Sequence, residues 1–129
     1  MEGLRRLLRP RKYARFYTRK GVFVVVGPQT SWGRKIQILD MSEGGCAFIY
    51  TGAREDLDEA GFLSLVDELN HAHHLDRLDY VTKSDSSLPD PHEKSKYLRR
   101  RGVAFKWLGE INRRRLKAFI EENSIGQAG

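Results

Sequence analysis

The chain has 129 residues, of which 40% are hydrophobic and 31% charged, and it carries a formal net charge of +6. This length favours one domain, and this hydrophobic content excludes an intrinsically disordered protein. Residues 22–26 form the longest wholly apolar run, far short of the roughly 20 residues that a membrane-spanning helix requires, so no membrane span is expected.

Cysteine content and the start of the chain bear on the compartment. A single cysteine, Cys46, excludes an internal disulfide framework and suits a reducing cytoplasm. No secretory signal peptide is expected, because no apolar stretch or cleavage site follows the Arg-rich start. We therefore expect a cytoplasmic protein in which Cys46 is a small buried apolar residue.

Positive charge is concentrated at the N-terminus. Residues 1–20 hold eight Lys and Arg side chains against one Glu, so this stretch carries +7 and the remainder is close to neutral. Leu4, Leu7 and Leu8 recur at helical spacing between its arginines. Pro10 ends this turn of helix, and so short a helix needs a protein groove, a lipid surface or a ligand to hold it. We expect residues 1–20 to form a flexible basic arm that binds anions.

Short strand-like segments follow the arm. They are apolar or alternating, and residues that favour turns bound them. Such a series is typical of a small antiparallel barrel or sandwich. The segments cover residues 22–26, 34–41, 46–50, 61–66, 75–81 and 98–107.

The rest of the chain predicts a loop and a helix. Residues 84–93 contain two prolines and three serines, so they are expected to form a mobile loop. Trp107 is expected to seal the last strand against the helix. The predicted fold is mainly β, a small six-stranded antiparallel barrel over residues 21–108 with a C-terminal α-helix over residues 109–123. The apolar side of that helix comprises Leu108, Ile111, Leu116, Phe119 and Ile120.

Two short motifs carry the chemistry. In R-x-x-x-R, Arg11 and Arg15 set two guanidiniums four residues apart in the arm. A guanidinium binds phosphate oxygens through two parallel N–H groups and also stacks on a base. In D-x-S-x-x-G, Asp40, Ser42 and Gly45 follow a strand at a turn. A carboxylate and a hydroxyl can meet the donor-rich edge of guanine, so together the motifs suit an anionic ligand with purine edges.

The order and spacing of these motifs resemble the PilZ domain family, whose members are receptors for the bacterial second messenger cyclic di-GMP. The resemblance runs over residues 9–122. It implies that Arg11 and Arg15 hold the phosphates and stack against the guanines. It also implies that Asp40 and Ser42 contact a guanine edge, while Gly45 keeps the turn open. No cofactor and no enzyme activity are expected.

Three further residues are secondary candidates for the ligand site. Lys12 and Gly44 lie within the motifs, and Tyr80 could offer a ring for base stacking, with a core or rim tyrosine as the alternative. Pro10 directly precedes the first arginine. The resemblance implies that the residue at this position influences whether one nucleotide or a stacked pair binds. The stoichiometry therefore stays open. The loop over residues 84–96 also looks longer than in a minimal member.

The mechanism implied is a disorder-to-order switch. Residues 9–20 are expected to be loose without ligand, to fold over the nucleotide, and then to present a new surface to an unidentified protein partner. Two alternatives stay open. One is a nucleic-acid-binding barrel whose basic arm tracks phosphates, which the few aromatics in the arm disfavour. The other is a PilZ-like interaction module that does not bind nucleotide.

Other clusters carry weaker signals. His71, His73 and His74 lack the second pair of ligands that a structural zinc site requires, so we expect a polar turn and no metal. No nucleophile-and-base pair or phosphate-loop pattern indicates catalysis. Two basic runs are interpreted as exposed rim charge, with alternate members pointing apart: Arg99, Arg100 and Arg101, and Arg113, Arg114 and Arg115.

Overall fold

The computed structural model describes residues 13–26, 34–69, 74–89 and 98–128. In these ranges no helix is long and apolar enough to cross a membrane. The elements in chain order are β1 (Arg15–Thr18), β2 (Val22–Val26), β3 (Arg34–Ser42), β4 (Gly45–Thr51), the 3-10 turn η1 (Arg54–Asp56), β5 (Ala60–Asp67), β6 (Leu75–Ser87), β7 (Leu98–Phe105), α2 (Glu110–Asn123) and β8 (Ser124–Ala128).

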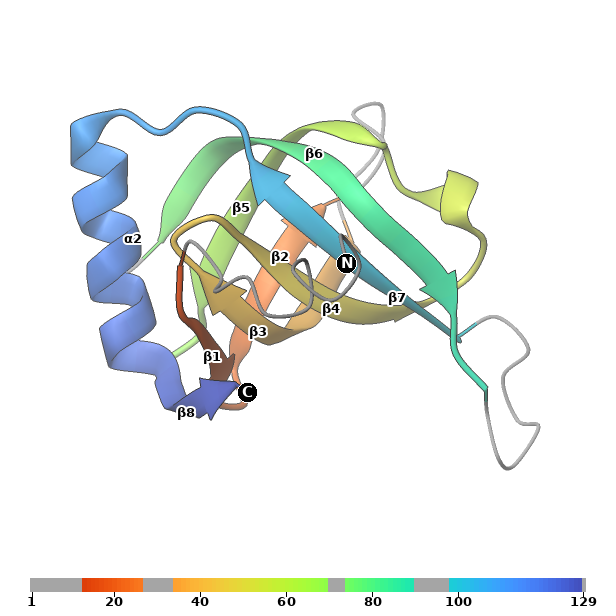
Figure 1. Cartoon of the computed structure of the whole chain (residues 1–129), viewed down its shortest axis with the longest axis horizontal. Helices are drawn as coiled ribbons and strands as arrows, with labels where there is room; N and C mark the ends of the chain where they lie inside the picture. The colour runs from red at the N-terminus through yellow and green to blue at the C-terminus, as the bar shows by residue number, and fades with distance from the viewer. Residues whose placement is uncertain (1–12, 27–33, 70–73, 90–97, 129) are drawn as a thin grey trace, which may run out of the picture.

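Six of the strands close into an antiparallel barrel, which confirms the predicted fold class (Figure 1). The order around the barrel is β2-β5-β6-β7-β4-β3, and β3 pairs back to β2. Side chains alternate between the inside and the outside of each strand. In β2, for example, Val22, Val24 and Val26 are buried in the core, while Phe23 and Val25 are only partly buried.

Two further strands and the helix complete the domain. β1 lies between β3 and β8, so that Phe16 faces Met41 on one side and Gln127 on the other. The helix α2 lies alongside the barrel, next to β1 and β8 (Figure 1). Leu116, Phe119 and Ile120 of α2 join the same hydrophobic core as the barrel strands.

Part of the predicted basic arm is a strand. Arg15–Thr18 was expected to be loose, but it forms β1 and pairs on both edges. Its second partner, β8, comes from the other end of the chain, and a local pattern carries no sign of it. Thr18 is buried and its hydroxyl donates to the carbonyl oxygen of Ile38 at 2.7 Å, which anchors the end of β1.

The predicted loop over residues 84–93 also begins later than expected. β6 continues to Ser87, with Asp85 opposite Arg101 and Ser87 opposite Arg99. These polar side chains extend the strand because β7 supplies guanidinium partners: Arg99 donates to both Asp85 and Ser87. Residues 90–97 of the predicted loop lie outside the described ranges.

Trp107 does not seal the helix against the barrel. Its side chain is 80% exposed, and Ile111 at the start of α2 is 70% exposed. The chain leaves the sheet after Phe105 and turns into α2 at Glu110, and in this connection Leu108 is the residue that packs against the core.

Candidate functional site

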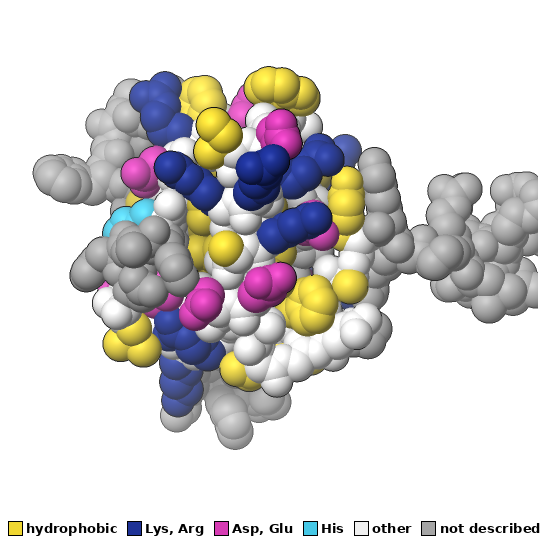
Figure 2. All heavy atoms as spheres, turned by 90° about the vertical axis from the view of Figure 1, so that its left-hand side faces the viewer, with side chains coloured by type: hydrophobic (Ala, Val, Ile, Leu, Met, Phe, Trp, Pro, Cys, Tyr) yellow, Lys and Arg dark blue, Asp and Glu magenta, His cyan; other side chains and the backbone are white. Residues whose placement is uncertain are grey.

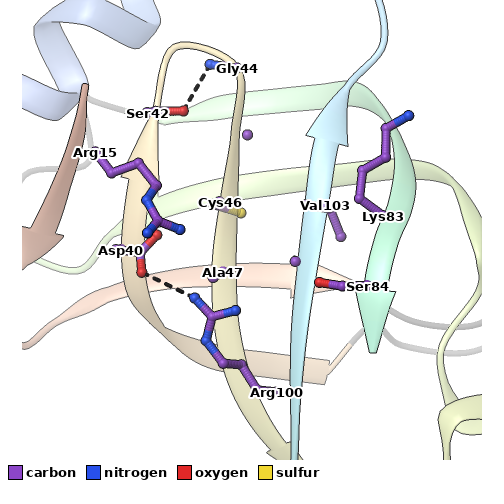
Figure 3. A pocket seen from close by; sticks show the side chains of 12 residues that line it. Arg15, Asp40, Ser42, Gly44, Cys46, Ala47, Lys83, Ser84, Arg100 and Val103 are labelled. Atoms are coloured by element: carbon purple, nitrogen blue, oxygen red, sulfur yellow. Dashed lines mark hydrogen bonds and ion pairs between the residues drawn. The ribbon is translucent and has the colours of Figure 1, made fainter. Parts of the chain in front are cut away.

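A pocket of about 250 Å³ lies on the outer face of the barrel, across the neighbouring strands β1, β3, β4, β7 and β6 (Figure 3). Its residues come from positions far apart in the chain, which the sheet brings together. Its charged and hydroxyl-bearing side chains are Arg15, Asp40, Ser42, Lys83, Ser84 and Arg100, and its glycines are Gly44, Gly45 and Gly102.

A bulge in β3 turns Asp40 toward this pocket. Ile38 lies opposite Phe48, but Asp40 lies opposite Ala47, so Leu39 is the extra residue. In a regular strand Asp40, two residues after the buried Ile38, would lie on the same face as Ile38, and the bulge turns it to the opposite face. Bulges re-aim side chains in this way and are common beside functional sites. Asp40 and Ser42 therefore both line the pocket.

A second bulge lies at the opposite rim, in β6. Thr82 faces Val103 and Ser84 faces Gly102, which leaves Lys83 as the extra residue. Lys83 and Ser84 consequently both line the pocket, although they are neighbours in a strand. Gly102 leaves room here, since a Cβ at this position would lie 2.9 Å from the Ser84 hydroxyl oxygen.

The pocket is positively charged around one carboxylate. Arg100 donates from Nη2 to Oδ2 of Asp40 at 3.4 Å, and only 5% of Asp40 is exposed. The guanidiniums of Arg15 and Arg100 both point toward this carboxylate (Figure 3). The buried Nε of Arg15 has no hydrogen-bond partner among the described residues. With Lys83, the pocket holds three cations against Asp40, which suits an anionic ligand.

The turn between β3 and β4 is shaped by two glycines and a serine. Ser42 accepts a hydrogen bond from the backbone N–H of Gly44 at 3.0 Å, which leaves its hydroxyl proton and a second lone pair for a ligand. A Cβ on Gly44 would lie 2.9 Å from the ring of Tyr13. At Gly45 a Cβ would lie 2.0 Å from the carbonyl oxygen of Val103, so this glycine allows β4 and β7 to approach.

The fold is similar to several solved structures. The PilZ domain of YcgR from Escherichia coli with c-di-GMP matches with a TM-score of 0.67 at 16% identity, over 88% of this chain and 91% of that chain. The K. pneumonia MrkH–c-di-GMP complex matches with a TM-score of 0.67 at 17% identity, over 89% of this chain and 52% of that chain. The domain is PilZ-like in fold.

Apo MrkH from K. pneumonia matches in the same way, with a TM-score of 0.66 at 17% identity, over 88% of this chain and 50% of that chain. The chain thus spans about half the length of MrkH. No protein-family model and no curated protein matches it. The PilZ-like fold is therefore recognised through three-dimensional similarity rather than close sequence identity.

The PilZ-like domain brings five of the predicted site residues into one pocket: Arg15, Asp40, Ser42, Gly44 and Gly45. The other two candidates of the first motif, Arg11 and Lys12, lie outside the described residues. Tyr80 is not part of the pocket. Its side chain is fully buried, and its hydroxyl donates to the carbonyl oxygen of Asp58 at 2.7 Å. Burial also raises its pKa to about 12, so Tyr80 is a core residue.

Lys83, Ser84, Arg100 and Gly102 of the pocket were missed by the sequence analysis. The interpretation of Arg100 as exposed rim charge is wrong, because it pairs with Asp40. The sequence did hold a signal for this difference. In a run of three arginines on a strand, the middle side chain must point to the opposite face from the other two.

The interpretation of Arg101 as exposed rim charge is also wrong, because this side chain is fully buried in the barrel. Its Nε donates to Asp85 at 2.7 Å, and its two terminal nitrogens donate to the carbonyl oxygens of Asp58 and Arg54 at 2.9 and 2.8 Å. Tyr50 also donates to Asp85. Burial alone would raise the pKa of Asp85, but hydrogen bonds from Tyr50, Arg101 and Arg99 outweigh it and hold the pKa below its usual value. This network fixes β6 against β7, which leaves Arg100 facing the pocket.

Two remaining candidates are less informative. Cys46 is buried beside the pocket, and burial, with a smaller effect of Asp40, raises its thiol pKa to about 12. It is therefore protonated and unreactive at neutral pH. Of the histidine cluster, His71 and His73 lie outside the described residues. The described part of the chain contains no group of three potential metal ligands.

Proposed function

We propose that this PilZ-like domain is a receptor for cyclic di-GMP, which binds in the pocket between β1, β3, β4, β6 and β7. The observation that carries the proposal is that Arg15 lines one pocket with Asp40 and Ser42, although the two motifs are separate in the chain. The similarity to YcgR and MrkH, whose solved structures hold c-di-GMP, supports the choice of ligand.

Charge and hydrogen-bonding capacity support the same ligand. Cyclic di-GMP carries two phosphodiester charges, and the pocket holds three cations and one carboxylate. In this proposal Arg15 binds a phosphate and stacks on a base, with Arg11 of the arm as its partner. Asp40 and the hydroxyl of Ser42 supply oxygens to the N–H groups of a guanine edge. Arg100 and Lys83 add charge from the opposite rim.

The arm gives the proposed receptor a means of signalling. Since β1 is already paired in the free domain, the part of the arm that would close over the nucleotide is residues 9–14. Ordering these residues costs conformational entropy, which the phosphate contacts of Arg11 would offset. The closed arm would present a surface to a protein partner. The proposed activity is binding, not catalysis, in a bacterial cytoplasm.

The nucleic-acid-binding alternative has one structural feature in its favour. Lys and Arg side chains gather on the face of the molecule that carries α2 (Figure 2), where Arg113, Arg114 and Arg115 are exposed. Carboxylates are interleaved with them, and Arg114 pairs with Glu110 at 2.7 Å. This mixture interrupts the continuous positive track that phosphate backbones require.

Titration calorimetry separates these functions. The protein is titrated with cyclic di-GMP, with GTP, and with single-stranded DNA at two salt concentrations. We expect saturable binding of cyclic di-GMP and at most weak binding of GTP. Binding of DNA alone, with a steep loss of affinity at higher salt, would identify a nucleic-acid-binding barrel. Absence of binding to all three would favour the interaction module without nucleotide.

A further inference from the structure

A second groove, of about 350 Å³, lies on the opposite face of β1. Alternation along this strand separates the two sites: Arg15 lines the first pocket, whereas Ala14 and Phe16 line the groove. The far wall of the groove comes from α2 and the start of β8. The remaining residues that line the groove are Glu43, Lys117, Ile120, Glu121 and Ser124.

The groove combines an apolar floor with a negative rim. Phe16 and Ile120 belong to the border of the hydrophobic core, so an apolar side chain placed there would extend that core. Glu43 and Glu121 outnumber Lys117, which lies 3.8 Å from the carboxylate of Glu43. A groove of this chemistry suits a segment that alternates apolar and cationic side chains.

Such a segment exists in this chain. Leu4, Leu7 and Leu8 alternate with Arg5, Arg6 and Arg9, and the proposed nucleotide site uses none of them. The described chain begins at Tyr13, directly before the groove residue Ala14. A tether of a few residues gives the leucine segment a high effective concentration at the groove, so even weak contacts would hold it.

We propose that residues 4–8 dock in this groove, with the leucines on its apolar floor and the arginines toward Glu43 and Glu121. Two anchored segments, residues 4–8 and β1, then leave residues 9–14 as a short loop that carries Arg11. This assignment is independent of whether the domain binds cyclic di-GMP.

Disulfide trapping in the full chain tests the docking. A cysteine is introduced at Arg5, Arg6 or Arg9 in turn and is combined with Ser124→Cys in the groove. The matched control is Ser84→Cys, the same exchange in the pocket on the opposite face of β1. A disulfide requires Cα atoms within about 7 Å, so its formation reports contact. Cys46 does not compete, because its pKa is raised to about 12 and it is buried.

Under mild oxidant we expect at least one position to form an intramolecular disulfide with position 124 about tenfold faster than with position 84. Replacing Leu4, Leu7 and Leu8 by serine should reduce that rate to the control value. Equal rates at the two faces, or a rate insensitive to the leucines, would overturn the proposal. A disulfide found only in a dimer, by mass spectrometry, would overturn it too and would show that a second copy fills the groove.

Discussion

Arg100 and Asp40 are 60 residues apart, yet Nη2 of one lies 3.4 Å from Oδ2 of the other. The contact reaches across β4, which lies between the strands that carry the two residues. It links the D-x-S motif to an arginine that the sequence alone indicated to be exposed rim charge. The carboxylate on which guanine recognition is proposed to depend is therefore already held by an arginine before any ligand binds.

Ligand selectivity is the first prediction. Cyclic di-GMP should bind more tightly than cyclic di-AMP, because adenine lacks the adjacent N1–H and 2-amino donors of guanine that Asp40 would meet. By analogy with base readout the preference should be about 1–3 kcal/mol. Calorimetry with both dinucleotides measures it, and Asp40→Ala should remove most of the difference. Equal affinity of the unsubstituted protein for both would contradict the role of Asp40.

The second prediction distinguishes specific nucleotide binding in the pocket from non-specific binding of anions to a positively charged surface. Arg15→Ala and Arg100→Ala should each weaken nucleotide binding roughly ten- to hundredfold, since a hydrogen bond to a charged group contributes about 1.5–3 kcal/mol. Arg113→Ala on the exposed face of α2 is the matched control and should leave affinity unchanged. A similar loss at all three positions, measured by calorimetry, would indicate a non-specific anion binder.

Gly45 provides a test of strand packing. Gly45→Ala places a Cβ 2.0 Å from the carbonyl oxygen of Val103, so β4 and β7 must separate. We expect a loss of stability of about 1–3 kcal/mol in thermal or denaturant unfolding. Gly126→Ala in β8 should be nearly neutral, because nothing lies within 4 Å of its added Cβ. An unaffected Gly45→Ala variant would contradict the tight strand contact.

Asp85 should make stability depend on pH. Asp85→Asn removes the charge that holds the buried Arg101 and should cost about 3–5 kcal/mol at neutral pH. Tyr50→Phe, which removes one hydrogen bond to the same charged carboxylate, should cost about 1.5–3 kcal/mol.

The folded pKa of Asp85 lies below its unfolded value of about 3.9. Its contribution is therefore complete above that pH and is lost as the pH falls through the folded pKa. The stability difference between the unsubstituted protein and Asp85→Asn should narrow accordingly in acid. Urea unfolding at several pH values checks this, and a pH-independent difference would contradict it.

Hydrogen exchange tests the proposed arm switch. In the free protein the amides of β1 should be protected, because β1 pairs with β3 and β8. Addition of cyclic di-GMP should protect residues 9–14 most, while β2 should change little. If residues 9–14 exchange at the same rate with and without saturating nucleotide, the proposal that the arm closes over the ligand is wrong, even if the nucleotide binds.

The sequence by itself determined the elements that depend on local order. Alternation and turn residues predicted six barrel strands and the closing helix, and β2 (Val22–Val26) agrees residue for residue. The motif D-x-S-x-x-G could also be recognised from the local sequence, because its residues follow one another around a single turn. Asp40, Ser42, Gly44 and Gly45 line one pocket in the structure.

Only the tertiary structure decided the rest, because it depends on pairing between distant segments. β1 forms a strand because it can pair with β8. Ser84 lines the pocket because a bulge in β6 sets it opposite Gly102. The arginine run shows the reason most directly. Arg100 and Arg101 are adjacent and chemically identical, but strand alternation places one beside Asp40 and the other in the barrel beside Asp85. Which face meets a carboxylate is set by neighbouring strands, and a local pattern carries no information about them.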